Sequence, residues 1–181
     1  GNNTADDYTV VNPSGGSVAV TDLNGNNVTV TNIDSGSDVG RLQINTLNGD
    51  DEVTVDVDGP ASDVIGVPIT FDGGAGSDLL IVTGTPVTVV DEVIYSPGPA
   101  VTEGRLLYQD AGDATLMTID FDNLEPVHEL VTAATLTVNS TNAANAINYT
   151  QGSSATRGLV SVDAFETIEF ENKVDLVLNG L

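Results

Sequence analysis

The sequence predicts an all-β protein, more specifically a parallel β-solenoid of short stacked strands with little or no helix. Short runs rich in Val, Ile, Leu and Thr alternate with turns rich in Gly, Asn and Asp. No stretch shows the apolar period of 3.6 residues that is typical of a helix. Aromatic residues make up only 4% of the 181 residues and tryptophan is absent, so aliphatic side chains must build the core, as in thin stacked coils.

Each strand is predicted from an apolar run bounded by turn residues. The clearest is Asp50–Asp58, in which Val53, Val55 and Val57 alternate with polar residues, as in a strand with one buried face. Ser96–Gly104 is rich in Pro and Gly and is predicted to be an irregular loop or insertion. The remaining predicted strands are Tyr8–Val11, Ser17–Thr21, Asn27–Thr31, Leu42–Asn45, Val67–Phe71, Leu79–Thr83, Val87–Val90, Val93–Tyr95, Arg105–Tyr108, Thr115–Phe121, Thr135–Asn139, Leu159–Val162, Thr167–Glu171 and Asp175–Leu178.

The most specific motif lies in one Gly-rich turn. Gly73–Ile81 reads G-G-A-G-S-D-L-L-I and matches the nonapeptide G-G-x-G-x-D-x-U-x at every fixed position, with Leu80 as the large apolar residue U. Glycines permit a positive φ and close backbone approach, while carbonyl and carboxylate oxygens are the ligands that Ca²⁺ prefers. The same form recurs at Leu47–Val55 and, in a poorer copy, at Asp6–Val10. The alternative is three ordinary acidic β-turns.

On these motifs the chain resembles the RTX-like, calcium-binding β-solenoid repeat segments of large secreted bacterial surface proteins. The strict motif covers nine residues, and a looser turn-plus-strand likeness covers most of the chain. The resemblance implies that Ca²⁺ is bound at the turns. The expected ligands are Asp72, Gly74, Gly76 and Asp78 at the strict motif, then Asp50 and Asp51, and then Asp6 and Asp7.

The charge of the chain also favours a cation as partner. The net charge is −23, from 27 acidic and 4 basic residues, which disfavours nucleic acid and insertion into an anionic membrane. Acidic turns stacked about 5 Å apart would repel by roughly 3 kcal/mol per pair at an effective dielectric constant near 20. Bound Ca²⁺ is the simplest way to offset this repulsion. The alternative is a charge spread over a solvated surface.

No catalytic set is recognised, and the chain is predicted not to be an enzyme. His128 is the only histidine and is expected to be a surface or turn residue. There is no G-x-S-x-G elbow, HExxH motif or P-loop. Acidic pairs could in principle hydrolyse glycosides, but cations and aromatic residues, which line sugar grooves, are scarce. Cysteine is absent, so disulfides and thiolate metal sites are excluded.

The chain is interpreted as a single segment of degenerate repeats, approximately 6–50, 51–145 and 146–181, the last continuing into residue 1 of a neighbouring copy. Leu42–Asn45 matches Leu176–Asn179, and the C-terminus followed by the N-terminus reads like the stretch 42–55. No leader or apolar span is present, and the first residue is Gly. We therefore expect a processed or excised piece of a longer, secreted precursor. The expected assembly residues are Gly1, Asn2, Asn3, Leu176, Leu178, Gly180 and Leu181.

The first functional hypothesis is a calcium-braced structural protein of an extracellular filament, matrix or surface layer, whose partner is itself in a head-to-tail homopolymer. The alternative is a stalk or ligand-binding module of a large calcium-dependent adhesin, with flanking repeats of the same precursor and extracellular glycans as partners. A minor alternative fold is an antiparallel β-sandwich of immunoglobulin type, although the Cys and Trp residues of that fold are missing.

Overall fold

The computed structural model describes residues 5–12, 17–23, 30–34, 40–58 and 63–180. Within these ranges the chain forms sixteen strands and no helix, and no helix that could span a membrane is found there. The strands are β1 (Asp7–Val11), β2 (Ser17–Asp22), β3 (Val30–Asp34), β4 (Leu42–Asn45), β5 (Glu52–Asp56), β6 (Ile69–Asp72), β7 (Leu79–Gly84), β8 (Glu92–Pro97), β9 (Gly104–Gln109), β10 (Thr115–Asp122), β11 (Val127–Val131), β12 (Ala133–Asn139), β13 (Ile147–Gln151), β14 (Gly158–Val162), β15 (Ile168–Phe170) and β16 (Lys173–Asn179).

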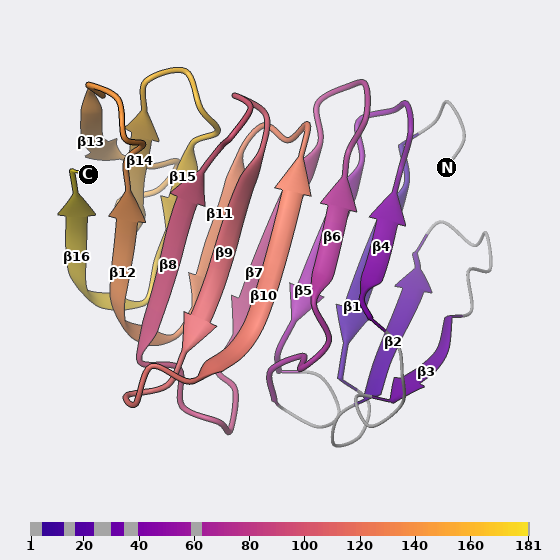
Figure 1. The fold of residues 1–181 in the computed structure, drawn as a ribbon. Helices are drawn as coiled ribbons and strands as arrows, with labels where there is room; N and C mark the ends of the chain where they lie inside the picture. The colour runs from indigo at the N-terminus through magenta and orange to yellow at the C-terminus, as the bar shows by residue number, and fades with distance from the viewer. Residues whose placement is uncertain (1–4, 13–16, 24–29, 35–39, 59–62, 181) are drawn as a thin grey trace.

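The strands form two sheets that pack face to face (Figure 1). The larger sheet has nine strands in the order β13-β14-β15-β11-β7-β5-β1-β2-β3. The smaller sheet has seven, in the order β16-β12-β8-β9-β10-β6-β4. Aliphatic side chains from alternate positions of both sheets fill the space between them, and each fully buried Val or Leu contributes about 1.5–3 kcal/mol. The all-β prediction is confirmed.

The predicted parallel solenoid is wrong, because both sheets are mixed. In the larger sheet, β1-β2-β3 and β13-β14-β15 pair antiparallel. In the smaller sheet, β9 runs antiparallel to both β8 and β10. The cause is the turn chemistry between strands. Asp110 closes the β9–β10 hairpin by accepting backbone N–H groups from Gly112 and Ala114, and Asp113 adopts a φ of 62°.

Individual strands also differ from the prediction. Val127–Val131 and Ile147–Gln151 are strands that the sequence pattern did not indicate, whereas the predicted strand Val87–Val90 is irregular. The predicted strand Asn27–Thr31 is observed as Val30–Asp34, and residues 24–29 lie outside the described part. The expected loop after Tyr95 is confined to the connection between β8 and β9.

One strand–turn–strand unit recurs three times in the middle of the fold, as β4–β5, β6–β7 and β10–β11. In each unit a strand of the smaller sheet leads through a turn into a strand of the larger sheet. Successive units pair in parallel, so that Val53 lies opposite Leu80 and Leu80 lies opposite Val127. The turns of the first two units therefore lie against each other.

The stacked turns explain why the motif needs glycine. Ala75 N–H donates to the Leu47 carbonyl at 2.8 Å, and Gly49 N–H donates to the Ala75 carbonyl at 3.0 Å. Gly76 has a φ of 151°, and a Cβ there would lie 1.5 Å from the Gly49 carbonyl oxygen. Only a residue without a side chain fits this approach. The G-G-x-G pattern thus sets the contact between neighbouring turns.

A buried ion pair joins the two sheets. Lys173, at the start of β16 in the smaller sheet, lies with its Nζ 2.5 Å from Oε2 of Glu129, on β11 in the larger sheet. Only 2% of the Lys173 side chain and 0% of the Glu129 side chain are exposed. Lys173 Nζ also donates to the backbone carbonyls of Val131 and Glu171. This pair anchors β16, whose one partner strand among the described strands is β12.

Candidate functional site

A column of acidic residues crosses the larger sheet, with one acid at the same register position on each of five adjacent parallel strands. The acid comes at the start of β1, β5, β7, β11 and β15, where the chain enters the sheet from a turn or loop. The register of the strands aligns these acids. The members of this acidic column are Asp6, Asp51, Asp78, Glu125 and Glu166.

Three members of the acidic column are almost completely buried. The exposed fractions are 2% for Asp6, 2% for Asp51 and 1% for Asp78. Oδ1 of Asp51 accepts the backbone N–H of Asp6 at 2.6 Å, and Oδ1 of Asp78 accepts that of Asp51 at 2.9 Å. In all three residues Oδ2 is buried and has no hydrogen-bond partner. A buried oxygen without a partner costs about 1–3 kcal/mol, and more when it is charged. A hydrogen-bond donor or a cation at the column would therefore stabilise the fold.

The turn that faces Asp78 leaves room for its carboxylate. A Cβ on Gly73 would lie 2.5 Å from the Asp78 Cβ and 2.7 Å from its Oδ2. Thr46 Oγ1 donates to the Gly73 carbonyl at 2.8 Å and fixes this turn against its neighbour. Oδ2 of Asp78 therefore occupies a space that any other residue at position 73 would fill.

The electrostatics of the column oppose full ionisation. Burial raises the pKa of Asp78, and the charges of Asp51 and Glu125 add to the rise, while the hydrogen bond from the Asp51 N–H opposes it. Neighbouring strands lie about 4.8 Å apart, so adjacent carboxylates repel by about 3 kcal/mol at an effective dielectric constant of 20. A cation between the strands would relieve both costs.

Glu166, the member of the acidic column that precedes β15, predicts that the free energy of unfolding depends on pH. Burial and the neighbouring Glu125 carboxylate raise the pKa of Glu166 from 4.5 to about 7. The folded chain thus holds a proton that the unfolded chain releases, and this stabilisation is complete below pH 4.5 and is lost as the pH rises through 7. In EDTA we expect the free energy of unfolding to fall between pH 5 and pH 8, and Glu166→Gln to flatten this fall.

Urea unfolding of both proteins at the two pH values measures the effect. Asp113→Asn, which changes an exposed carboxylate of the β9–β10 hairpin, is the matched control and should keep the wild-type slope. A Glu166→Gln protein with the same pH slope as the wild type would contradict the assignment.

The structure separates the predicted ligands into several locations. Asp78, Asp51 and Asp6 come together in the acidic column. Asp72 ends β6 in the other sheet, where its Oδ1 accepts the side-chain N–H of Asn123 at 2.9 Å. The remaining predicted ligands also lie outside the column: Asp50 is exposed and accepts the Ser77 N–H at 3.0 Å, Asp7 belongs to β1, and Gly74 and Gly76 lie in the turn with positive φ values.

Glu125 and Glu166 were missed at the sequence level, although a signal was present. Every member of the acidic column stands two residues before a buried apolar residue of its strand. The pattern acid-x-apolar is therefore common to all five positions. It was overlooked at these two because Glu replaces Asp and no Gly-rich turn precedes them.

The column does not present a preformed cage of side chains. Among the described residues, no group of three or more acidic or histidine side chains could hold a metal ion. An ion between two neighbouring strands would have two carboxylates from the column, and backbone carbonyls and water would complete the six to eight oxygen ligands of Ca²⁺. The arrangement thus fits a series of weak sites better than a single tight one.

The expected assembly residues fall into two groups. Gly1, Asn2, Asn3 and Leu181 lie outside the described residues. Leu176 and Leu178 belong to β16, at the edge of the smaller sheet, and Gly180 follows this strand. Leu178 is 43% exposed.

A second polar cluster surrounds His128. Its Nε2 lies 3.9 Å from Oε1 of Glu169, which is buried and also accepts hydrogen bonds from Ser153 Oγ at 2.6 Å and Arg157 Nη1 at 2.9 Å. Burial opposes ionisation of Glu169, but the Ser153 and Arg157 hydrogen bonds outweigh it and lower its pKa to about 2. His128, expected to be a surface or turn residue, thus lies within β11 with 19% of its side chain exposed, beside a carboxylate whose hydrogen bonds are satisfied.

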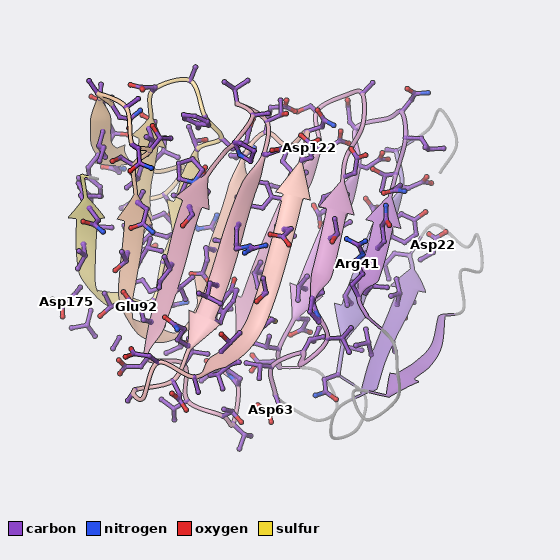
Figure 2. The ribbon with its side chains drawn as sticks, in the orientation of Figure 1. Asp22, Arg41, Asp63, Glu92, Asp122 and Asp175 are labelled. Carbon is purple, nitrogen blue, oxygen red and sulfur yellow. The ribbon has the colours of Figure 1, made fainter. Side chains whose placement is uncertain are left out.

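The outer face of the smaller sheet carries a shallow groove of about 610 Å³. It lies between β4, β6 and β10 on one side and the β8–β9 connection on the other, and Asp122, labelled in Figure 2, is one of its lining residues. Its central feature is the ion pair between Arg105 Nε and Asp120 Oδ1, 2.5 Å apart.

Comparison of the chain with models of protein families, with curated proteins and with solved structures gives no match.

Proposed function

We propose that the chain is a non-enzymatic building block of an extracellular filament, matrix or surface layer, and that Ca²⁺ bound along the acidic column braces its fold. One observation carries this proposal. Asp6, Asp51 and Asp78 stack in register with their Oδ2 atoms buried and without hydrogen-bond partners. A divalent cation is the ligand that such a set of oxygens selects.

The overall charge supports a cation-dependent role. With 27 acidic against 4 basic residues, the folded chain repels itself, and two copies repel each other. Calcium at the column would reduce both effects. An extracellular setting supplies Ca²⁺ at the concentrations that weak sites of this kind need.

The extended two-sheet architecture supports a structural role. The two sheets, packed face to face, extend along one common direction, and the smaller sheet ends in edge strands at β16 and β4 (Figure 1). Edge strands with free backbone groups favour pairing with another chain. Self-association in a head-to-tail manner, without ring closure, would produce an open fibre.

The alternative function is a ligand-binding module of a calcium-dependent adhesin, and the groove on the smaller sheet is the observation that favours it. Gln43, Thr70 and Asp120 offer hydrogen-bonding groups there, as a glycan requires. The aromatic side chains in its lining, Phe71 and Phe121, are buried and offer no exposed ring for a sugar to stack on. We therefore place this function second.

Electron microscopy of the purified chain, negatively stained in calcium and in EDTA, tests the proposal. Filaments that form in calcium and disperse in EDTA are the expected result. Filaments that persist in EDTA would support the structural role and would contradict a role for calcium. Monomers in both conditions, together with binding to a glycan array, would replace the proposal with the adhesin function.

A further inference from the structure

We propose that β16 of one copy adds as a parallel strand to β4 of a second copy, so that the smaller sheets of successive copies join into one continuous sheet. This inference rests on the proposed self-association and names the two surfaces that carry it. The partner is a second copy of this chain. The two surfaces lie at opposite edges of the smaller sheet (Figure 1).

The outer edge of β16 is exposed and apolar. Within the described part of the chain β16 pairs with β12 alone, and in that register Leu176 and Leu178 lie beside residues of β12 that are fully buried. The core-facing row of the sheet thus continues onto β16 at Leu176 and Leu178, of which Leu178 is 43% exposed, and Val174 near the start of the strand is 83% exposed. Val177, on the outer face, is 45% exposed. A further strand beside β16 would cover this row.

The edge of β4 offers the complementary strand. Among the described strands β4 pairs with β6 alone, and its core-facing residues Leu42 and Ile44 are 4% and 8% exposed. Gln43 and Asn45 point to the other face and are exposed, as is Arg41, directly before the strand. β4 therefore has the same alternation of apolar and polar residues as the sheet it would join.

The two edges also run in the same direction. β16, β12 and β8 are parallel to one another, as are β10, β6 and β4. β9 is antiparallel to both β8 and β10, so the two groups share one direction. Copies related by translation along the sheet would thus bring β16 beside β4 in parallel, as in most other pairs of this sheet.

One register satisfies both faces of the new strand pair. The facing residues are Leu176 with Leu42, Leu178 with Ile44, Asp175 with Arg41, and Asn179 with Asn45. A shift of one residue would place leucines opposite polar residues, because the side-chain period of a strand is two. A shift of two residues would keep the faces but would separate Asp175 from Arg41.

Charge complementarity selects this register. Asp175 and Arg41 lie at opposite edges of the smaller sheet, and neither makes an ion pair with another described residue (Figure 2). Asn179 Nδ2 already donates to Asn139 Oδ1 at 3.1 Å, and Asn139 donates to Ser96. Asn45 of the second copy would extend this row of hydrogen-bonded side chains by one member.

Disulfide capture tests the register directly, because the chain contains no cysteine. Asp175→Cys and Arg41→Cys proteins are prepared separately, mixed in calcium and oxidised mildly. Facing positions on neighbouring strands have the Cα separation that a disulfide needs, so the mixed dimer should exceed either homodimer by about tenfold. Asp63→Cys replaces Asp175→Cys in the control mixture and should show no such preference.

Charge reversal gives a second readout in the uncross-linked protein. Asp175→Arg and Arg41→Asp should each weaken association about tenfold in sedimentation velocity, and the double variant should recover to within about threefold of the wild type. Circular dichroism checks that each variant is folded. Filaments without preferential capture or charge rescue would overturn this interface but leave the proposed function standing. A chain that stays monomeric would overturn both.

Discussion

Lys173→Met is expected to lower the free energy of unfolding by about 3–5 kcal/mol, the largest loss that we predict for any single side chain. Lys173 and Glu129 form a buried pair with Nζ and Oε2 2.5 Å apart. Without Lys173, a carboxylate with 0% exposure is left in the core. Burial already raises the pKa of Glu129, with Lys173 opposing that rise, so the variant should bind a proton and lose less stability at pH 5 than at pH 8.

The matched control removes both charges. A Glu129→Leu/Lys173→Met double variant replaces the pair with apolar side chains of similar volume and should lie within about 1 kcal/mol of the wild type or above it. Urea unfolding at the two pH values compares the three proteins. A single variant that unfolds at the wild-type urea concentration would show that the pair contributes nothing to the anchoring of β16.

The strands were predictable where a single physical signal determines them. In β5, Val53 and Val55 alternate with polar residues, and the structure buries both completely. β11 escaped prediction because Pro126 precedes it and because Glu129 occupies a core position, which the pattern reads as a solvent-facing one. The charge of Glu129 is offset chiefly by Lys173, which is 44 residues away in sequence.

The sheet topology could not be derived from apolar alternation alone. A short strand looks the same whether its neighbour is parallel or antiparallel, and the connections decide between the two. The β9–β10 hairpin depends on Asp110 and on Asp113 at positive φ, a turn signal that is separate from the apolar alternation of the two strands. The first two parallel units, β4–β5 and β6–β7, follow in contrast from turns with a Gly-Asp pattern that is visible in the sequence.

The acidic column was predictable in part, for a similar reason. Asp78 and Asp51 follow Gly-rich turns whose resemblance is visible in the sequence, and the structure places them on adjacent strands. Glu125 and Glu166 enter the column through the register of β11 and β15, which depends on long-range pairing. No local pattern reveals which strands become neighbours at that distance.

Asp78→Asn is expected to have opposite effects in EDTA and in calcium. In EDTA the variant should be more stable than the wild type by about 1–2 kcal/mol, because it removes a buried charge next to Asp51 and Glu125. The Asn carbonyl oxygen can still accept the N–H of Asp51. In calcium at about 100 times the dissociation constant, the wild type should gain about 2.7 kcal/mol per site, and the variant should lose most of this gain.

Thermal and urea unfolding of both proteins across a calcium titration measure the two effects, with Asp113→Asn as a control that removes an equal charge at an exposed position where Asn tolerates the positive φ. The control should follow the wild type in both conditions. If Asp78→Asn stabilises equally in EDTA and in calcium, the buried oxygens reflect repulsion without a bound ion, and the calcium part of the proposal fails. If it destabilises equally in both, the charge of Asp78 stabilises the fold without a bound cation, because the Asp51 N–H donates a stronger hydrogen bond to a carboxylate than to an amide oxygen. Only a change in the free energy of unfolding that reverses sign between EDTA and calcium assigns the cation to this column. Hydrogen bonding and repulsion alone would change the stability in the same direction in both conditions.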